Sequence, residues 1–455
     1  MIQKLHSLVW GPALLTLLLI TGGLYTLRFK GFQILGIRTW WKHTIGSLFA
    51  DTKDSREEKR EHSVTKAQAA CTALAATIGT GNIVGVATAL TAGGPGAIFW
   101  MWVSAVIGMA TAYGETWLGL KHRYRSLQGV WVCGPAVYLS RGLHMPVMGF
   151  VYGILCLLAS LGMGSMVQSN AIAQTIQFST GTSPVFSAVI VTTLTCCVAV
   201  GGISRIAHVT ERLIPWAAGI YIAFSLMVLL LCYRQIPVAF QEIFQCALFP
   251  QAVVGGAGGY GISRAFRYGI ARGVFSNEAG LGSLAGLHGA TDDTTPEEQG
   301  MWAMFEVFFD TIIICTLTAL VILCVTKGNL SGEYGDGAVL TARCFGAVLG
   351  KLGEHLVSVS MVIFAFATMI AWFFLGRQTL EAVMEQISGW IFLSERLKKR
   401  IRQGYLVLYG YAVFLGCVSS LTSVWELSDI WNGMMAFPNI LALLLLHRQV
   451  RYPLK

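Results

Sequence analysis

Long apolar stretches alternate with short polar segments along the whole chain. A helix that crosses a bilayer needs about 20 mostly apolar residues, and eleven stretches come close to that length or exceed it. They are residues 8–27, 68–92, 97–120, 147–175, 183–203, 213–233, 246–262, 301–325, 353–375, 404–420 and 424–446. The pattern predicts an all-α polytopic membrane protein with about eleven transmembrane helices.

The composition supports this class. Charged residues make up 12% of the 455 residues and hydrophobic residues 55%, whereas globular proteins carry about 25% charged residues. Too few charges remain to cover the surface of soluble domains. The counts therefore exclude a disordered chain, a disulfide scaffold and a soluble enzyme, and they make the lipid bilayer the expected surroundings.

The distribution of Lys and Arg predicts the orientation. If the segment 28–66 is cytoplasmic and the spans alternate, the inner segments hold 27 basic residues and the outer segments hold 5. This is the positive-inside pattern. It predicts a cytoplasmic (inner) membrane of the bacterial type, an outside N-terminus and a cytoplasmic C-terminus. The first span follows Lys4 but lacks a small-residue cleavage site, so we expect it to stay uncleaved.

The sequence predicts neither a nucleic-acid partner nor a metal site built from cysteine and histidine. The net charge of +9 falls in clusters between apolar stretches, without an aromatic-interleaved basic patch, so no nucleic-acid partner is predicted. The eleven cysteines form no CxxC pair, and no His/Cys cluster has metal-ligand spacing. No cofactor is expected beyond a coupling ion, and the oligomeric state is not defined by the sequence.

Two of the apolar stretches are unusually rich in glycine. Residues 75–85 read AATIGTGNIVG and residues 254–261 read VGGAGGYG. Glycine weakens a helix, and a broken helix in lipid is tolerated only where it lines an enclosed cavity. The alternative is close helix packing through small residues. Because the two stretches lie five spans apart, we favour broken helices in two inverted halves.

The predicted boundaries follow from that repeat. Residues 1–66 form an extra transmembrane helix and a cytoplasmic loop, 67–235 the first five-helix repeat, 236–446 the second repeat and 447–455 a cytoplasmic tail.

Five long blocks resemble the alanine/glycine:cation symporter family. They are TALAATIGTGNIVGVATALTAGGPGAIFWMW (72–102), GGISRIAHVTERLIP (201–215), ARGVFSNEAGLGS (271–283), EVFFDTIIICTLTAL (306–320) and FAFATMIAWFF (364–374). The resemblance implies a leucine-transporter-type fold with two inverted five-helix repeats. It also implies sodium-coupled, or sometimes proton-coupled, uptake of small neutral amino acids, chiefly alanine and glycine.

A zwitterionic substrate needs groups for its carboxylate and for its amino group. Unwinding at Gly79 to Gly81 frees backbone N–H groups at the positive end of a half-helix. We expect Thr77, Gly79, Thr80 and Gly81 to hold the carboxylate; the alternative is that the threonines bond to their own helix. The family has a glutamine near the substrate in the motif that contains Gln168, so this residue is the predicted partner of the amino group.

Further residues compete for or complete that site. Asn170 is an alternative to Gln168, and both amides have helix packing as an alternative role. The carbonyls at Gly255 and Gly256 in the second glycine-rich stretch are further candidates. Trp372 is predicted to cap the pocket and to restrict the substrate to a small side chain, or else only to pack.

A sodium ion is held by several oxygen atoms, which unwound carbonyls and hydroxyls supply without placing a charge in lipid. By resemblance to the common sodium site of the fold, the carbonyls of Ala75 and Ile78 face the hydroxyl of Thr368, and the carbonyl of Ala365 completes the site. Ala367 stands where related proteins often have serine, which leaves sodium or proton coupling open.

Two carboxylates lie on one face of the eighth span. Asp310 is a candidate proton or gating site, because an ionisable group within a membrane is functional by default. Glu306 is expected nearer the inner end, as a structural partner of loop arginines. Residues 275–283 form either a cytoplasmic gating element or the true second break, and Arg264, Arg267 and Arg272 argue against the latter.

Other function classes are less consistent with the sequence. No GxSxG or HExxH motif marks a membrane enzyme, and no catalytic residues are predicted. A channel needs rings of charge or a filter motif. The remaining alternatives are a proton-coupled or an uncoupled amino-acid permease.

Overall fold

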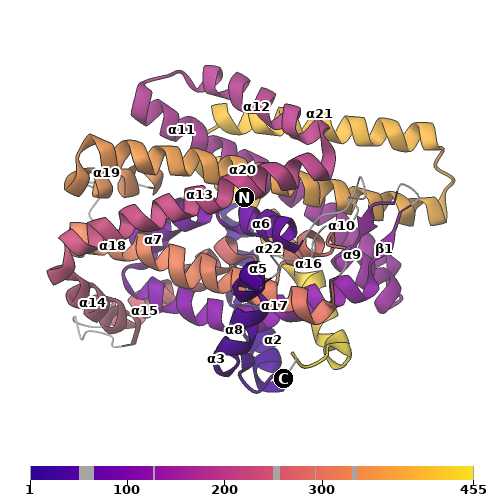
Figure 1. Cartoon of the computed structure of the whole chain (residues 1–455), viewed down its shortest axis with the longest axis horizontal. Coiled ribbons are helices and arrows are strands. Elements are labelled where there is room, and N and C mark those ends of the chain that lie inside the picture. The colour runs from indigo at the N-terminus through magenta and orange to yellow at the C-terminus, as the bar shows by residue number, and fades with distance from the viewer. Residues whose placement is uncertain are drawn as a thin grey trace.

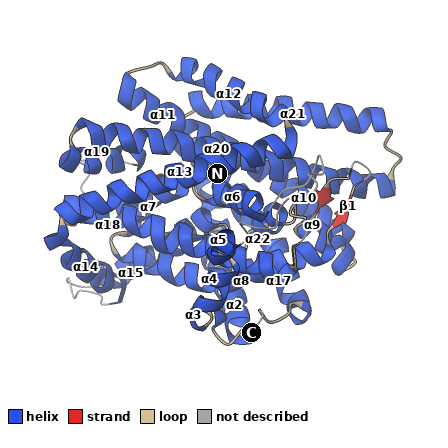
Figure 2. Cartoon of the chain, viewed as in Figure 1, coloured by secondary structure: helices blue, strands red, loops and turns tan. Residues whose placement is uncertain are grey.

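The computed structural model describes residues 2–50, 66–126, 129–248, 257–292, 294–329, 335 and 337–453. Within these residues the chain is almost entirely helical, and two short strands form one antiparallel hairpin (Figure 2). Eight helices in this part are long and apolar enough to cross a membrane, or nine if one bent pair is counted as a span. The predicted helical membrane class is confirmed; the total of eleven spans stays a prediction.

The first half of the chain reads as follows. Its elements are α1 (Ile2–Val9), α2 (Pro12–Arg28), α3 (Phe32–Leu35), α4 (Ile37–His43), α5 (Ile45–Ala50), α6 (Lys66–Thr77), η1 (Gly81–Gly85), α7 (Val86–Gly93), α8 (Gly96–His122), β1 (Tyr124–Arg125), β2 (Trp131–Val132), α9 (Pro135–Val137), η2 (Tyr138–Gly142), α10 (Pro146–Leu161), η3 (Gly162–Val167), α11 (Gln168–Thr180), α12 (Pro184–Val200) and α13 (Gly202–Leu231).

The second half continues the helical pattern. Its elements are η4 (Tyr233–Gln235), α14 (Ile236–Leu248), α15 (Ala257–Asn277), α16 (Ser283–His288), α17 (Pro296–Val307), η5 (Phe308–Cys315), α18 (Thr316–Thr326), α19 (Gly337–Leu349), α20 (Lys351–Trp390), α21 (Glu395–Val418), α22 (Leu421–Leu446) and η6 (His447–Gln449).

The helices form two packed groups around α8 and α20. α15 and α17 pack along α8, and α13, α11, α19 and α6 pack around α20. α12 and α21 lie side by side in an outer layer against α20 (Figure 1). Several helices expose large apolar side chains, such as Trp216 and Leu230 of α13 at 75% and 73%. Such a surface suits a lipid environment.

The predicted break in the second span is present. α6 ends at Thr77 and η1 begins at Gly81, and the helix axis bends by 41° between the segments Gln68–Thr77 and Gly81–Gly93. The break coincides with the glycine-rich sequence that predicted it, because glycine has the lowest helix propensity after proline.

The seventh predicted span was given too early an end. The structure has α15 at Ala257–Asn277, well beyond the predicted limit at residue 262, and the chain leaves the helical conformation after Asn277. Glu278 has φ +59°, and Gly280 and Gly282 have φ +88° and +86°. Left-handed residues end a helix, so the break lies at 278–282, the second of the two positions considered.

The stretch between the ninth and tenth predicted spans is mostly helical. α20 continues to Trp390 and α21 begins at Glu395, so most of residues 376–402 belong to these two helices. The polar segment 51–65, within the predicted first cytoplasmic loop, lies outside the described residues.

α17 begins at a capping box, in which the Thr295 hydroxyl accepts from the Glu298 N–H at 3.2 Å.

Candidate functional site at the two helix breaks

The residues predicted to bind the cation meet where α6 ends. The Thr368 hydroxyl of α20 lies 2.8 Å from the Ala75 carbonyl oxygen, 3.4 Å from that of Ile78 and 3.0 Å from that of Phe364. All these residues are buried. The geometry therefore places three of the four predicted ligands together. The fourth, Ala365, is buried one turn earlier in α20, and the role of its carbonyl stays a prediction.

The unwound segment after Thr77 has its backbone N–H groups in contact with side chains. The Gly79 N–H donates to Asn82 Oδ1 at 2.9 Å, and the Thr80 N–H donates to Gln168 Oε1 at 3.2 Å. Gln168 itself donates to the Met163 carbonyl. The Thr80 hydroxyl is buried and has no hydrogen-bond partner among the described residues. Gln168 and Thr80 thus lie together, with one polar atom of Thr80 left for a ligand.

Two glycines are required here by the close approach of neighbouring helices. A Cβ atom on Gly79 would lie 2.5 Å from Thr368 Oγ1 and 3.2 Å from Gln168 Oε1. A Cβ atom on Gly81 would lie 2.9 Å from the Cα atom of Ser276 in α15. The first break therefore fits directly against α20, α11 and α15.

Thr77 and Glu306 have partners that the sequence did not indicate. The Thr77 hydroxyl donates to Glu306 Oε1 at 3.1 Å, and Glu306 Oε2 lies 2.8 Å from His288 Nε2. The expectation that Glu306 pairs with loop arginines is wrong, because its carboxylate is buried between α6 and α16. With this bond, the hydroxyl of Thr77 is engaged with a protein group, and its role toward substrate stays a prediction.

Asp310 lies within hydrogen-bonding distance of both breaks. Its carboxylate accepts from Asn82 Nδ2 at 2.6 Å, from the Ser276 hydroxyl at 2.8 Å and from the Thr311 hydroxyl at 2.8 Å. Asn82 belongs to η1 and Ser276 to the end of α15. A carboxylate with three donors is well satisfied without a metal ion, so the contacts describe a bridge between the two discontinuous helices.

Trp372 contacts the second break. Its indole N–H donates to Glu278 Oε1 at 2.8 Å, and a Cβ atom on Gly164 would lie 2.5 Å from its Cβ atom. Glu115 of α8 accepts from the Gly282 N–H at 3.1 Å on the other side of the break. The predicted capping residue therefore packs between η3 and residues 278–282.

Gly255 and Gly256 lie outside the described residues, and their role stays a prediction. The amide of Asn170, the alternative to Gln168, has partners away from this cluster. Asn170 donates to the carbonyls of Gly416 and Ser419 at 2.8 and 2.9 Å. Its amide therefore connects α11 to the end of α21, which fits the helix-packing alternative.

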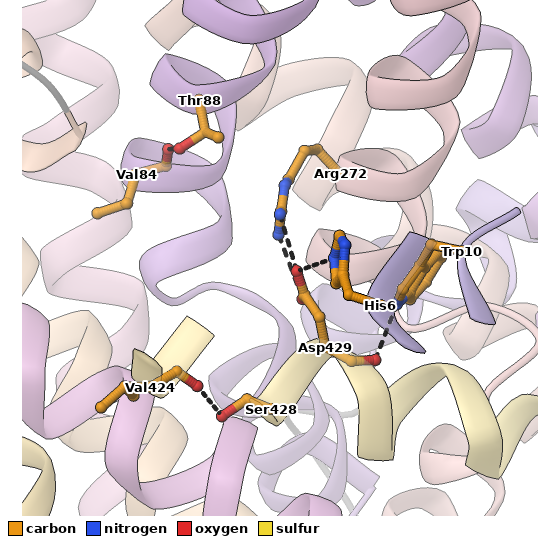
Figure 3. Close-up of polar contacts among 8 residues, drawn as sticks. All are labelled: His6, Trp10, Val84, Thr88, Arg272, Val424, Ser428 and Asp429. Atoms are coloured by element: carbon orange, nitrogen blue, oxygen red, sulfur yellow. Dashed lines mark hydrogen bonds and ion pairs between the residues drawn. The ribbon is translucent and has the colours of Figure 1, made fainter. Parts of the chain in front are cut away.

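A buried ion pair explains how α15 carries an arginine inside the bundle. Arg272 Nη2 lies 2.8 Å from Asp429 Oδ2, and Nη1 lies 3.3 Å from Oδ1 (Figure 3). The His6 ring contacts the same carboxylate at 3.2 Å, and the Trp10 indole donates to the Asp429 carbonyl at 2.8 Å. The N-terminal segment is thereby fixed to α22.

An aromatic pair covers the arginine. The Arg272 guanidinium lies 5.4 Å from the Phe275 ring centre and 5.1 Å from that of Trp425, and these two rings stack at 4.9 Å. Cation–π contacts of this kind stabilise a desolvated cation. The argument that Arg272 excludes a break at 278–282 is therefore wrong, because Asp429 and the two rings compensate its charge.

A bundle of long apolar helices, with two broken helices that meet at a buried polar centre, defines a multi-pass membrane transporter rather than an enzyme. The chain belongs to the sodium:alanine symporter family, whose sequence profile matches residues 1–455.

Several known proteins are similar to this chain over almost its full length. An uncharacterized transporter of Haemophilus influenzae is 38% identical over 99% of this chain and 94% of its own. The sodium/alanine symporter AgcS of Methanococcus maripaludis is 37% identical over 98% of this chain and 94% of its own. The probable sodium/glutamine symporter GlnT of Bacillus subtilis is 30% identical over 99% and 88%.

A solved structure supports the fold alone. A Na⁺-coupled sialic acid symporter superposes with a TM-score of 0.54 over 99% of both chains at 12% sequence identity.

Proposed function

We propose that the protein is a sodium-coupled symporter that takes up small neutral amino acids, alanine or glycine, by alternating access. The observation that supports this most directly is the contact of Thr368 Oγ1 with the carbonyls of Ala75 and Ile78 at the first break. These three oxygens come from two helices and carry no formal charge. Such a set suits a monovalent cation at mid-membrane.

The substrate groups of the proposal lie one turn further along the chain. Thr80 has a buried hydroxyl without a hydrogen-bond partner among the described residues, and this hydroxyl is the proposed contact of the carboxylate, together with Gly79 and Gly81. Gln168 is the proposed contact of the amino group, and Trp372 limits the size of the side chain. The names of the curated relatives, which include a sodium/alanine symporter, support the same substrate class.

The proposal includes the arrangement of the chain in the membrane. We propose eleven spans, one extra N-terminal span followed by two inverted halves of five, with the N-terminus outside and the C-terminus in the cytoplasm. Arg264, Arg267 and Arg272 belong to α15 rather than to an inner loop, and without them the basic residues still lie mostly in the proposed cytoplasmic segments.

The test is uptake of a panel of labelled amino acids into proteoliposomes, with sodium and pH gradients imposed separately. We expect saturable alanine or glycine uptake that a sodium gradient drives. Uptake driven by the pH gradient alone favours a proton-coupled permease. Counterflow of labelled alanine into alanine-loaded vesicles separates a carrier from a channel, because a channel gives no accelerated exchange.

A further inference from the structure

A buried acid–base pair lies beside the proposed binding site. Glu306 of α17 and His288 of α16 are in contact at 2.8 Å, and their side chains are only 2% and 1% exposed. Neither residue is among the groups proposed to contact sodium or substrate. The other carboxylate oxygen of Glu306 accepts from the hydroxyl of Thr77, the last residue of α6.

The orientation of Gln299 follows from its surroundings. The Thr294 hydroxyl lies 3.2 Å from the carboxylate oxygen of Glu298, and a carboxylate only accepts. The hydroxyl hydrogen of Thr294 is therefore used, and its oxygen accepts from Gln299 Nε2 at 3.3 Å. This leaves Gln299 Oε1 as the atom that faces His288 Nδ1 at 2.9 Å.

The hydrogen-bond partners then define where the hydrogens of His288 lie. Because Gln299 Oε1 only accepts, Nδ1 of His288 must carry a hydrogen. The contact between His288 Nε2 and Glu306 Oε2 consequently holds a single proton. It belongs either to the imidazolium or to the carboxylic acid, and the pair is neutral in both cases. Without this proton, the lone pair on Nε2 would face the negatively charged carboxylate oxygen at 2.8 Å, which is a repulsive contact.

The pair connects the moving parts of the proposed transporter. Thr77 is the last residue before the first break, α16 follows the second break, and α17 is a continuous helix packed on α8. The hydrogen bonds Thr77–Glu306–His288 thus hold both broken helices to α17. A change of charge at this point acts on both breaks together.

The titratable groups near the pair are other buried carboxylates. Glu306 interacts electrostatically with Glu115 on α8, Glu278 after α15 and Asp310 on η5, whereas its direct partners are His288 and Thr77. α6 faces it with the uncharged Thr77. α4 also packs on α17, but through the Trp40 ring against Phe305 and Phe308.

We propose that Glu306 and His288 form a proton-binding site whose single shared proton holds α6 against α16 and α17. When the proton leaves the Nε2–Oε2 contact for water, the pair changes from neutral to a net charge of −1. Repulsion then separates the two side chains and releases Thr77 together with the end of α6. This inference rests on the proposed function, because α6 carries the proposed cation and substrate groups.

The first test is the pH profile of alanine uptake at saturating sodium, with equal pH on both sides of the proteoliposome membrane. Loss of one proton lowers wild-type uptake about tenfold per pH unit above the transition. In Glu306→Gln, an amide N–H takes the place of the shared proton, and the amide oxygen still accepts from Thr77. The uptake rate of this variant, expressed relative to its own maximum, should vary by less than about twofold from pH 6 to pH 9.

Matched controls exclude general effects of charge. His355→Asn and Glu395→Gln replace exposed residues of the same types, and both should keep the wild-type profile. A wild-type profile in Glu306→Gln overturns the proposal.

The second test does not require transport. Amide hydrogen exchange of residues 66–77 and 283–288 is measured on the full chain in detergent and corrected for the intrinsic base-catalysed rate. Protection should fall with rising pH in the wild type and stay constant in Glu306→Gln. Equal behaviour of the two proteins overturns the proton site. Absence of saturable alanine uptake in the wild type contradicts the proposed function instead, so the two failures are distinguishable.

Discussion

Arg272 of α15 and Asp429 of α22 form a two-contact ion pair, 157 positions apart in the chain and almost completely buried. A buried cation without a counter-charge is costly in any apolar medium. The pair therefore makes an arginine acceptable in a helix that ends at the second break. It also fixes the position of α15 relative to α22. The N-terminal residues His6 and Trp10 contact the same aspartate of α22.

Replacement of Asp429 by Asn should destabilise the protein strongly. The substitution leaves the Arg272 guanidinium buried without a counter-charge, which costs about 3–5 kcal/mol. We expect a clear decrease of the midpoint of thermal unfolding in detergent. The double variant Arg272→Met/Asp429→Leu should be more stable than Asp429→Asn, because neither charge remains. An equal loss in Glu385→Gln, which breaks the exposed pair with Arg141, would contradict this assignment, since exposed pairs contribute below about 1 kcal/mol.

Gly79→Ala should abolish transport while the protein still inserts and folds. Its Cβ would lie 2.5 Å from Thr368 Oγ1, so the contact between α6 and α20 has to open. Gly85→Ala is the matched control in the same region, because a Cβ there meets nothing within 4 Å. The measurement is alanine uptake normalised to the amount of protein in the membrane. Normal uptake by Gly79→Ala would refute the close approach of the two helices.

Thr368→Ala should raise the sodium concentration needed for half-maximal transport. Loss of one neutral ligand in a dry site costs about 1–3 kcal/mol, which corresponds to about a tenfold weaker cation affinity. Alanine affinity at fixed sodium should also decrease, because the coupling of two ligands is reciprocal. Thr368→Ser keeps the hydroxyl and serves as control. Unchanged cation dependence in Thr368→Ala would overturn the assignment of Thr368 as a cation ligand.

Trp372→Ala should widen the range of substrates. The indole is fully buried between Gly164 and Glu278, and its removal leaves space for a larger apolar side chain. Competition of unlabelled leucine or methionine against labelled alanine measures the effect. We expect stronger competition in the variant than in the wild type, and an unchanged inhibition pattern would show that Trp372 does not limit substrate size.

The proposed orientation is testable with single cysteines in a cysteine-free background. Ser183 and Ser394 are exposed at the ends of α12 and α21. The charge distribution predicts Ser183 outside and Ser394 inside. An impermeant thiol reagent added to intact cells should label Ser183→Cys and not Ser394→Cys, and the reverse pattern would invert the topology.

Local composition was enough to predict the class of the fold and the first break. Apolar length defines a spanning helix, and the glycines around Thr80 weaken one at a particular place. The contact of Thr368 with Ala75 and Ile78 was predicted only through the resemblance to a known family. No local signal in the sequence connects α20 to α6, because the two segments lie almost 300 residues apart.

The second break was predicted at the wrong position because the prediction considered only the energetic cost of individual residues in a membrane helix. The glycines at 254–261 suggested a break, and Arg272 argued against the later position. The compensation comes from Asp429, Phe275 and Trp425, and pairing with Asp429 depends on the tertiary fold. The Glu306–His288 pair was missed for the same reason, since its partners lie on different helices.

The contact of Gly164 with Trp372 restricts how this sequence can diverge. Residue 164 can gain a side chain only if residue 372 also loses its Cβ atom or if the two backbones move apart, because the two Cβ atoms would otherwise lie 2.5 Å apart. A descendant that acquires a differently shaped pocket by this route needs two substitutions, and the first one alone is expected to impair the protein. If the pocket has the proposed size limit, the packing of Gly164 against Trp372 makes that limit slow to change during evolution, because no single substitution removes it without cost.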